Sequence, residues 1–322
     1  MQDLNTNNSI KIFQKDFVGK DYIEEIHTNN HVCECCDSTE FTILGNVKML
    51  HKNAMAIRCM KCNHVVKSYI PTGNELMKFY QTISHDDIAI FKNKVKEQLV
   101  FIKDNFDIDN IENMLEIGSG PKGIFDFLSS DIKKYALEVD NNAIIKLESK
   151  GIKTFTSFDD IDIKFDLIIL SHVLEHIVDD IGDYIDKLLS LLSDDGCIFI
   201  EVPMSKYELI LDNERITNNN FCESHFRSFS KKSFENFLLK KKNIIYKVVE
   251  EESSLSKLEL SFKKSYSNLI FDIQSKINFK KRLLISLLKI FYFITLTSLF
   301  TLLKRLMKKP ESSIRVLISK KV

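Results

Sequence analysis

The sequence predicts an α/β protein built on a doubly wound, mostly parallel sheet of seven strands. The first observation is that short apolar runs alternate with helix-like segments from about residue 111 onward, an alternation typical of a parallel sheet with helices on both faces. The second is a group of glycines directly after the first apolar run. The third is that two Cys-x2-Cys pairs precede the sheet, while a basic-flanked apolar segment comes before its last strand.

Seven apolar runs are the expected strands: 114–117, 135–139, 152–155, 167–170, 197–202, 244–249 and 314–320. Ligands bind such sheets at the carboxyl ends of the strands. One or two helices are expected over 75–105, a short helix over 123–130, and a further helix over 231–241, for which Ser230 is the natural N-cap.

The first strand is followed at once by Gly118, Gly120 and Gly123. Glycines let the chain turn sharply and let its backbone amides approach a ligand. Such a pattern indicates a nucleotide site only if a strand precedes it, a helix follows it and an acidic residue ends the next strand. The run 114–117, the expected helix over 123–130 and Glu138 meet these conditions. Glu116 argues against a dinucleotide, because a carboxylate beside the loop repels a pyrophosphate.

These motifs resemble the class I S-adenosylmethionine-dependent methyltransferases, whose first motif is an acidic residue followed by a glycine loop. The stretch 165–176 contains the His-Val-Leu-Glu-His signature of one branch of that family, and 191–203 is similar to its helix, glycine turn and fifth strand. The resemblance implies a Rossmann-like sheet in which 314–320 is the antiparallel edge strand, with S-adenosylmethionine as cofactor. The cofactor-binding residues it implies are Glu116, Gly118, Ser119, Gly120, Gly123, Glu138, Asp159 and Ser171. Asp160 and Asp162 compete with Asp159 for the adenine contact.

Two histidines, His172 and His225, are candidates for acid–base catalysis. His225 lies in a segment similar to the family's His-x-x-x-Phe-Ser pattern, and a methyl acceptor OH must lose its proton as it attacks. A hydrogen-bonded structural histidine is the alternative. His172, Glu175 and His176 also resemble the Glu-x-x-Glu-His set with which ubiquinone-pathway O-methyltransferases bind a divalent cation, with a histidine replacing the first glutamate. Packing against the sheet is the other interpretation of these positions.

The two Cys-x2-Cys pairs, Cys33 with Cys36 and Cys59 with Cys62, are separated by 22 residues. Four thiolates can close a tetrahedron around zinc, and a closed site leaves no position for chemistry, so the pattern predicts structural zinc in a ribbon-like module. A segment this short gains its fold from the metal. Cys35 can replace a neighbour as a ligand, and free thiols are the remaining alternative.

The net charge of zero hides an asymmetry along the chain. From Ile273 onward there are 12 Lys and Arg residues against a single acidic residue, Glu311, so the rest of the chain is net acidic. The basic residues of 280–309 flank an apolar run over 283–303 that is long enough to span a bilayer. Because 314–320 must return to the sheet, a helix or hairpin lying on the membrane surface is expected. A buried helix or a dimer contact is the alternative.

The expected organisation is an N-terminal arm (1–25), a zinc-ribbon-like module (26–70), linker or lid helices (71–110), a catalytic core (111–253 and 312–322) and a helical insertion (254–311). The arm has no apolar core, so no signal peptide is expected. A cytoplasmic protein that contacts the inner face of the membrane peripherally is the corresponding prediction.

The preferred function is O-methylation of a sugar, or of another small or lipid-linked acceptor, in surface-glycan biosynthesis. Methyltransferases with a zinc head that act on nucleotide-linked sugars resemble the N-terminal two-thirds of this chain. One alternative is an RNA methyltransferase, although the basic charge lies on an apolar segment rather than on a face suited to nucleic acid. Another is a non-catalytic, cofactor-binding membrane adaptor. The acceptor, the methylated atom and the oligomeric state stay open.

Overall fold

The computed structural model describes residues 10–15, 21–26, 32–69, 71–82, 92–121, 123–205, 209–212, 215–219, 222–251 and 312–321. The expected insertion over 254–311, with its apolar run at 283–303, lies outside the described residues. The membrane-surface interpretation therefore stays a prediction. Among the helices that the structure describes, none is both long and apolar enough to cross a membrane.

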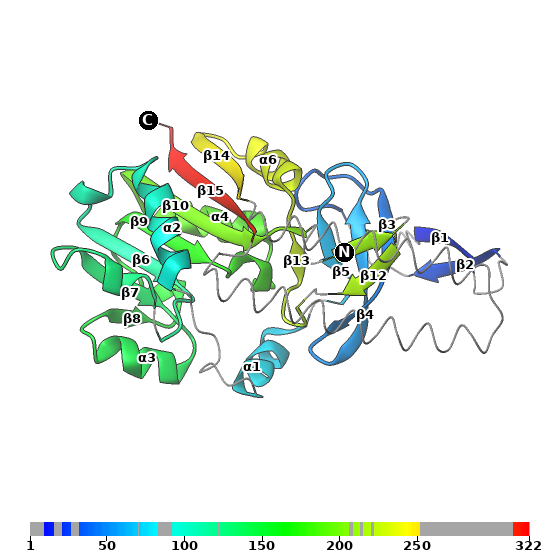
Figure 1. Ribbon diagram of the computed structural model, residues 1–322, viewed down its shortest axis with the longest axis horizontal. Coiled ribbons are helices and arrows are strands. Elements are labelled where there is room, and N and C mark those ends of the chain that lie inside the picture. The colour runs from blue at the N-terminus through cyan, green and yellow to red at the C-terminus, as the bar shows by residue number, and fades with distance from the viewer. Residues whose placement is uncertain are drawn as a thin grey trace, which may run out of the picture.

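A seven-stranded sheet forms the larger part of the molecule, with the strand order β14-β15-β10-β9-β6-β7-β8 (Figure 1). Its strands are β6 (Asn113–Ile117), β7 (Lys133–Leu137), β8 (Lys153–Phe155), β9 (Phe165–Ser171), β10 (Leu192–Pro203), β14 (Ile244–Glu251) and β15 (Ser313–Lys320). Only β15 runs antiparallel to its neighbours. The predicted seven-stranded, mostly parallel sheet is confirmed. The strand order reverses between β6 and β9, so a ligand crevice is expected at their carboxyl ends.

The strands carry apolar side chains toward both faces of the sheet. The helices are α1 (Gly73–Thr82), α2 (Lys92–Lys103), α3 (Asn141–Glu148), α4 (Ile181–Leu191) and α6 (Lys231–Leu239), with 3-10 turns η2 (Ile108–Asn110), η3 (Phe125–Phe127), η4 (Phe158–Asp160) and η5 (Leu174–His176). On β9, Ile168 and Leu170 pack in one layer with α4 and α6, whereas Leu167 and Ile169 pack in the other with α2 and α3. Burial on both faces is the reason that these strands form continuous apolar runs in the sequence.

Side-chain caps mark the starts of helices around the large sheet. Asp140 and Asp180 accept hydrogen bonds from backbone N–H groups at the starts of α3 and α4. Ser230 caps α6 and forms a reciprocal capping box with Ser233, which confirms the cap predicted at this position.

Two sequence predictions about elements are wrong. The helix expected over 123–130 is only the single turn η3, because Leu128 is already in an extended conformation. The strand β15 is antiparallel as expected but is not at the edge, because it lies between β10 and β14. Its interior position follows from its side chains, since Ile314, Val316 and Ile318 are fully buried.

A smaller sheet, with the order β13-β5-β4-β3, stands beside the large one. Its strands are β3 (Phe41–Met49), β4 (Lys52–Cys59), β5 (Val65–Lys67) and β13 (Arg227–Ser228); two hairpins pair β1 (Ile10–Lys15) with β2 (Asp21–Ile26) and β11 (Leu209–Asp212) with β12 (Arg215–Asn219). β13 belongs to the segment before α6 and is the edge strand of the small sheet on the side of the large sheet (Figure 1). The apolar cluster of the large sheet also contains Cys33, Cys35, Cys36, Cys59 and Cys62. The strands of the small sheet have a separate apolar cluster, which includes Leu44, Val47 and Met49.

Candidate active site

The glycine loop after β6 has left-handed backbone at all three glycines, with φ of +62° at Gly118, +58° at Gly120 and +39° at Gly123. A Cβ at Gly118 would lie 2.8 Å from Cγ2 of Val173, and a Cβ at Gly123 would lie 2.7 Å from Oε2 of Glu116. A Cβ at Gly120 would meet nothing within 4 Å. The outer glycines therefore allow the loop to pack, whereas the middle one faces open space from which a ligand can approach the backbone.

Glu116 lies beneath this loop. Its carboxylate is almost fully buried, and Oε2 accepts a hydrogen bond of 2.9 Å from the N–H of Ile124. Burial raises the pKa of Glu116 to about 7, and the negative charge of Glu138 adds to the shift. No cationic side chain among the described residues opposes that rise. A buried carboxyl group of this kind fits a ligand that brings positive charge to the loop.

Glu138 joins the end of β7 to the glycine loop. Its Oε2 accepts a hydrogen bond of 2.9 Å from the N–H of Gly120, and its Oε1 accepts hydrogen bonds from the N–H groups of Val139 and Asp140. Three charge-assisted hydrogen bonds fix this carboxylate beside the loop. Glu138 therefore lies beside the glycine loop, and its contact with a ribose stays a prediction.

The other residues predicted to contact the cofactor differ in how deeply they are buried. Ser119 is buried in the loop, and Ser171, at the end of β9, accepts a hydrogen bond of 2.7 Å from Nε2 of Gln98 on α2. Asp159 lies in η4 and is exposed, as are Asp160 and Asp162. The choice among these three aspartates for an adenine contact therefore stays open.

His172 follows β9 in a left-handed conformation, with φ of +56°. Its Nδ1 lies 3.3 Å from Oε1 of Glu175, and its Nε2 lies 3.4 Å from Oε1 of Glu201. Lys94 of α2 contacts the same Nε2 and lies 3.3 Å from the Glu201 carboxylate. A helix predicted as a linker or lid thus supplies a cation to the site.

Glu175 interacts with three histidines, His172, His176 and His225, and we call these four residues the acid–base cluster. It is fully buried, and neither carboxylate oxygen receives a hydrogen bond from a described residue. Nε2 of His225 lies 4.0 Å from its Oε1, and the ring of His225 meets that of His176 nearly at right angles, with centroids 4.5 Å apart. The structure therefore brings both predicted catalytic histidines, His172 and His225, to one buried carboxylate.

The same cluster has the composition of a cation site. Potential ligand atoms of Glu175, His176 and His225 lie within 4.8 Å of one another. Nδ1 of His176 lies 3.0 Å from the carbonyl oxygen of Ser224, to which it can donate a hydrogen bond. Two imidazoles and a carboxylate suit several divalent metals. The set differs from the one considered in the sequence, because His225 takes the place of His172.

Burial and neighbouring charges shift the protonation equilibria of the cluster. Burial favours neutral Glu175, yet the contact with His172 and the charges of the surrounding imidazoles hold its pKa at about 2. Burial and the neighbouring His225 lower the pKa of His176 to about 4. For His172, burial and Lys94 favour the neutral ring, but the nearby carboxylates outweigh them and raise its pKa. Glu175 is therefore an anion that can stabilise a protonated imidazole.

Sequence reasoning missed a buried ion pair behind these histidines. Glu201 of β10 lies opposite Arg315 of β15, and Nε of Arg315 is 2.7 Å from Oε2 of Glu201. Gln98 donates a hydrogen bond of 2.9 Å to Oε1 of the same carboxylate. Each of the two apolar runs contains a lone charged residue, which indicates that each residue is buried with a partner but does not identify that partner.

The four predicted metal ligands form a compact centre at the end of the small sheet. Sγ of Cys33 lies 3.5 Å from Sγ of Cys62, Sγ of Cys36 lies 3.5 Å from Sγ of Cys59, and the four sulfur atoms lie within 4.8 Å of one another. A tetrahedral zinc site with Zn–S bonds of about 2.3 Å separates its sulfurs by roughly 3.8 Å. The cluster therefore fits a thiophilic divalent cation. The thiol of Cys35 lies beside those of Cys33 and Cys62, and its role as an alternative ligand stays open.

The two knuckles of this centre have equivalent backbones. The N–H of Asp37 donates to the carbonyl of Cys33, and the N–H of Asn63 donates to the carbonyl of Cys59, at 2.8 and 3.0 Å. Both Asp37 and Asn63 are left-handed, with φ of +58° and +61°. The same turn in both knuckles places the two cysteines of each pair side by side. Asp and Asn suit the left-handed position that follows, because they tolerate this conformation better than most residues.

Several solved methyltransferase structures are similar to this chain. The plantazolicin methyltransferase BpumL in complex with SAH shares 14% identity at a TM-score of 0.44, over 77% of this chain and 90% of that one. Coclaurine N-methyltransferase, bound to N-methylheliamine and SAH, shares 13% at 0.44, over 74% and 75%. Phosphoethanolamine N-methyltransferase 2 of Haemonchus contortus, in complex with S-adenosyl-L-methionine, shares 12% at 0.43, over 70% and 52%. A search of curated protein sequences found no match.

A family model described as a methyltransferase domain matches residues 80–242, just over half of the chain. The matched region begins in α1, includes the glycine loop, Glu138 and both predicted catalytic histidines, and ends after α6. The chain therefore belongs to the methyltransferase-domain family and is a methyltransferase enzyme.

Proposed function

We propose that the methyl donor is S-adenosylmethionine, held at the carboxyl ends of β6, β7 and β9. The observation that carries the proposal is the buried carboxyl group of Glu116, for which no described residue supplies a cation, beneath an open glycine loop. A sulfonium and an amine bring positive charge to this carboxyl group, whereas a pyrophosphate would bring more negative charge. The residues proposed to surround the cofactor are Glu116, Gly118, Ser119, Gly120, Gly123, Glu138, Asp159 and Ser171.

We assign the general base to His225. When bound, S-adenosylmethionine supplies an activated methyl carbon. An acceptor hydroxyl must lose its proton as it attacks, and the imidazole of His225 receives that proton. Nε2 of the ring faces the Glu175 carboxylate at 4.0 Å, and this negative charge stabilises the resulting imidazolium. His172 shares the same carboxylate and is the second candidate for the role.

The proposed acceptor is the hydroxyl of a sugar or of another small or lipid-linked molecule, in surface-glycan biosynthesis. The proposed base is mostly buried, with only 13% of the His225 side chain exposed. A base with so little exposed surface favours an acceptor that presents a small group over one that presents an extended duplex. The glycan assignment itself depends on the resemblance to methyltransferases with a zinc head.

Transfer of labelled methyl groups to fractionated cell extract tests this function. The protein is incubated with labelled S-adenosylmethionine and with small-molecule, lipid and RNA fractions. The expected result is label in a small-molecule or lipid fraction, lost in His225→Gln and retained in His51→Gln, which changes an exposed histidine of the small sheet. Label confined to RNA would identify an RNA methyltransferase instead. Cofactor binding without any transfer would indicate an adaptor and contradict the proposal.

We further propose that Cys33, Cys36, Cys59 and Cys62 hold one structural zinc per chain. The sulfur separations support this assignment, and four protein ligands leave no open position for chemistry. Metal analysis of anaerobically purified protein is expected to give one zinc per chain, and serine variants of these cysteines are expected to lose it. Protein that contains no zinc under these conditions would exclude the assignment.

A peripheral membrane contact through 280–309 also stays a proposal. It is motivated by the apolar run and its basic flanks, since each basic residue near an anionic surface contributes about 1 kcal/mol. The wild-type protein is expected to float with anionic liposomes at low salt. The double variant Leu288→Glu with Phe293→Glu is expected not to bind them. Wild-type protein that stays behind in the flotation gradient would rule the contact out.

A further inference from the structure

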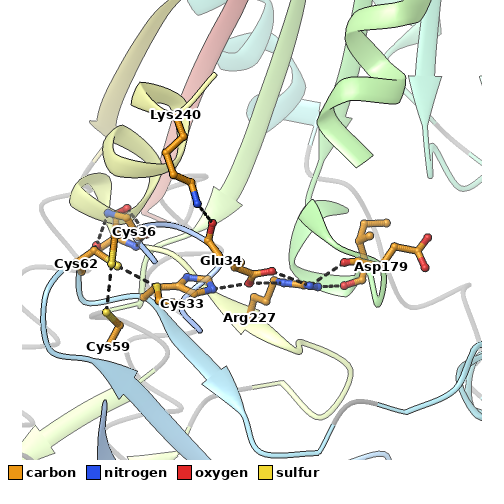
Figure 2. A network of polar contacts seen from close by, with 12 residues as sticks. Cys33, Glu34, Cys36, Cys59, Cys62, Asp179, Arg227 and Lys240 are labelled. Atoms are coloured by element: carbon orange, nitrogen blue, oxygen red, sulfur yellow. Dashed lines mark hydrogen bonds and ion pairs between the residues drawn. The ribbon is translucent and has the colours of Figure 1, made fainter. Parts of the chain in front are cut away.

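A buried arginine connects the cysteine centre to the backbone that follows Glu175. Arg227, in β13, is only 4% exposed. Its Nε and Nη2 lie 2.7 and 3.0 Å from the two carboxylate oxygens of Glu34. Nη2 also donates to the carbonyl oxygen of Asp179 at 2.8 Å, and Nη1 donates to that of Ile177. Figure 2 shows the guanidinium between the Glu34 carboxylate on one side and the Asp179 backbone on the other.

The first end of this connection belongs to the cysteine centre. Glu34 stands directly after Cys33, inside the first knuckle. Its Oε1 lies 2.7 Å from Nε2 of His64, which comes two residues after Cys62 in the second knuckle. Glu34 therefore contacts both knuckles, and the position of its carboxylate depends on how the knuckles are held together. A metal bound by thiolates from both would fix that arrangement.

The other end belongs to the acid–base cluster. Ile177 and Asp179 follow η5, the turn that carries Glu175. The N–H of Phe226 donates a hydrogen bond of 2.9 Å to the carbonyl of Glu175. The stretch 225–227 thus supplies both His225 and the groups that hold the backbone of 175–179. These contacts join the backbone of Glu175 to the segment that carries His225.

We propose that Arg227 is a positioning residue, through which the metal state of the cysteine centre sets the geometry of the Glu175–His225 pair. The inference rests on the proposed zinc site and the proposed catalytic role of His225. When the centre holds a thiophilic divalent cation, Glu34 is fixed, the guanidinium is fixed by Glu34, and the 175–179 backbone is fixed by the guanidinium. When the cation is removed, the 175–179 backbone loses this support.

Arginine is required at this position because its planar fork makes several directed contacts at once. Arg227 forms two bonds to one carboxylate and two to backbone carbonyls. A lysine provides one compact charge and cannot reproduce a bidentate contact together with both carbonyl contacts. The charge-conserving variant Arg227→Lys therefore removes the connection without removing the charge.

Amide hydrogen exchange of the full chain tests the proposal without requiring an acceptor. Exchange is followed in peptides that cover 174–180, with peptides from β9 and β10 as internal references, in the zinc-loaded protein, after chelation, and after Zn²⁺ is added back. The variants are Arg227→Lys and Glu34→Gln. The matched control is Lys240→Ala, because Lys240 contacts the same knuckle at the Glu34 carbonyl and at Asp37, and neither of these contacts involves 175–179.

Both variants are expected to retain zinc and to raise exchange in 174–180 by about tenfold, while the β9 and β10 peptides remain protected. Chelation of the wild type is expected to produce the same local increase, and added Zn²⁺ is expected to reverse it. In Arg227→Lys, neither chelation nor added Zn²⁺ is expected to change 174–180 further, because the connection is already broken. Lys240→Ala is expected to behave as the wild type does.

The proposal is overturned if 174–180 stays protected in Arg227→Lys and Glu34→Gln, or if the effects of chelation and of Arg227→Lys add. Exchange that rises equally in β9 and β10 would also overturn it, because it would show a general loss of stability. These outcomes are separable from a failure of the proposed function. A protein that transfers no methyl group can still show the metal-dependent protection, and an active enzyme can lack it.

Discussion

The burial of Glu116 beneath the glycine loop makes the protonation of this side chain part of the folding equilibrium. Its pKa is about 7 in the folded protein, against 4.5 for an unperturbed glutamate. Between these values the folded state holds a proton that the unfolded state has released. Stability is therefore greatest below pH 4.5 with respect to this group and falls as pH rises toward 7.

We expect the free energy of unfolding of the cofactor-free protein to fall by about 3 kcal/mol from this group over that pH range. Glu116→Gln is expected to flatten the profile, and Glu112→Gln, which changes an exposed glutamate at the opposite end of β6, is expected to leave it unchanged. Denaturant titrations at several pH values measure the effect. A profile of the same slope in Glu116→Gln and wild type would show that the buried carboxyl group is not its source.

Removal of the Glu138 side chain is expected to weaken binding of S-adenosylmethionine by about 1.5–3 kcal/mol, the scale of hydrogen bonds to a charged group. The physical reason is that this carboxylate both orients Gly120 and offers acceptors beside the loop. Calorimetric titration of Glu138→Ala measures the loss. Glu148→Ala, at the exposed end of α3, is the control. Equal dissociation constants for Glu138→Ala and wild type would remove Glu138 from the cofactor site.

The position of a single residue could be predicted where a sequence motif determines it. It could not be predicted where the pairing of distant elements determines it. Glu116 and Glu138 follow from the strand and loop pattern. Glu201 and Arg315 could not be paired in advance, because the position of β15 between β10 and β14 sets their register. The contact between Lys94 and His172 likewise depends on how α2 crosses the sheet, which no local pattern encodes.

At the scale of elements, different glycines of the loop after β6 are expected to serve folding and ligand binding. Gly120 faces open space, whereas Gly118 and Gly123 each lie against a side chain. Gly120→Ala is expected to cost about 1–2 kcal/mol of stability from left-handed strain and, in addition, to abolish cofactor binding.

The matched control is Gly151→Ala, because Gly151 has a φ of +77°, also faces open space and lies after α3, away from the loop. Gly151→Ala is expected to lose similar stability without any loss of binding. Thermal melts and cofactor titrations of both variants supply the comparison. Binding that survives in Gly120→Ala would show that the ligand does not approach this part of the backbone.

Strands of the large sheet were predictable because burial on both faces leaves uninterrupted apolar runs, as at 167–170. The turn η3 was mistaken for a helix because its sequence is apolar and lies between a glycine loop and a strand. The two-residue strand β13 could not be found at all, since its pairing with β5 joins segments far apart in the sequence. Its two residues, Arg227 and Ser228, form no hydrophobic pattern that would distinguish them from a loop.

At the scale of the whole molecule, the cysteine centre packs against the large sheet. The five cysteines of the knuckles share an apolar cluster with β9, β10 and α6, and Ser230 at the start of α6 donates a hydrogen bond of 3.0 Å to the carbonyl of Cys62. Removal of the metal is therefore expected to lower the melting temperature slightly, in a single transition, while β9 and β10 stay protected at the lower temperature of the exchange experiment. Calorimetric melts with and without chelator test this. An unshifted main transition after verified zinc loss would indicate that the centre contributes nothing to the shared core.

The central claim is that a cationic methyl donor binds beside Glu116 at the carboxyl edge of the sheet. The most direct measurement is calorimetric titration of the wild type with S-adenosylmethionine at pH 6, in buffers that differ in ionisation enthalpy. Because a cation favours the ionised form of Glu116, the account predicts one site per chain and release of about one proton on binding. It also predicts almost no release at pH 8.5 and none in Glu116→Gln. Absence of binding, or binding at pH 6 with no proton released, would contradict the account.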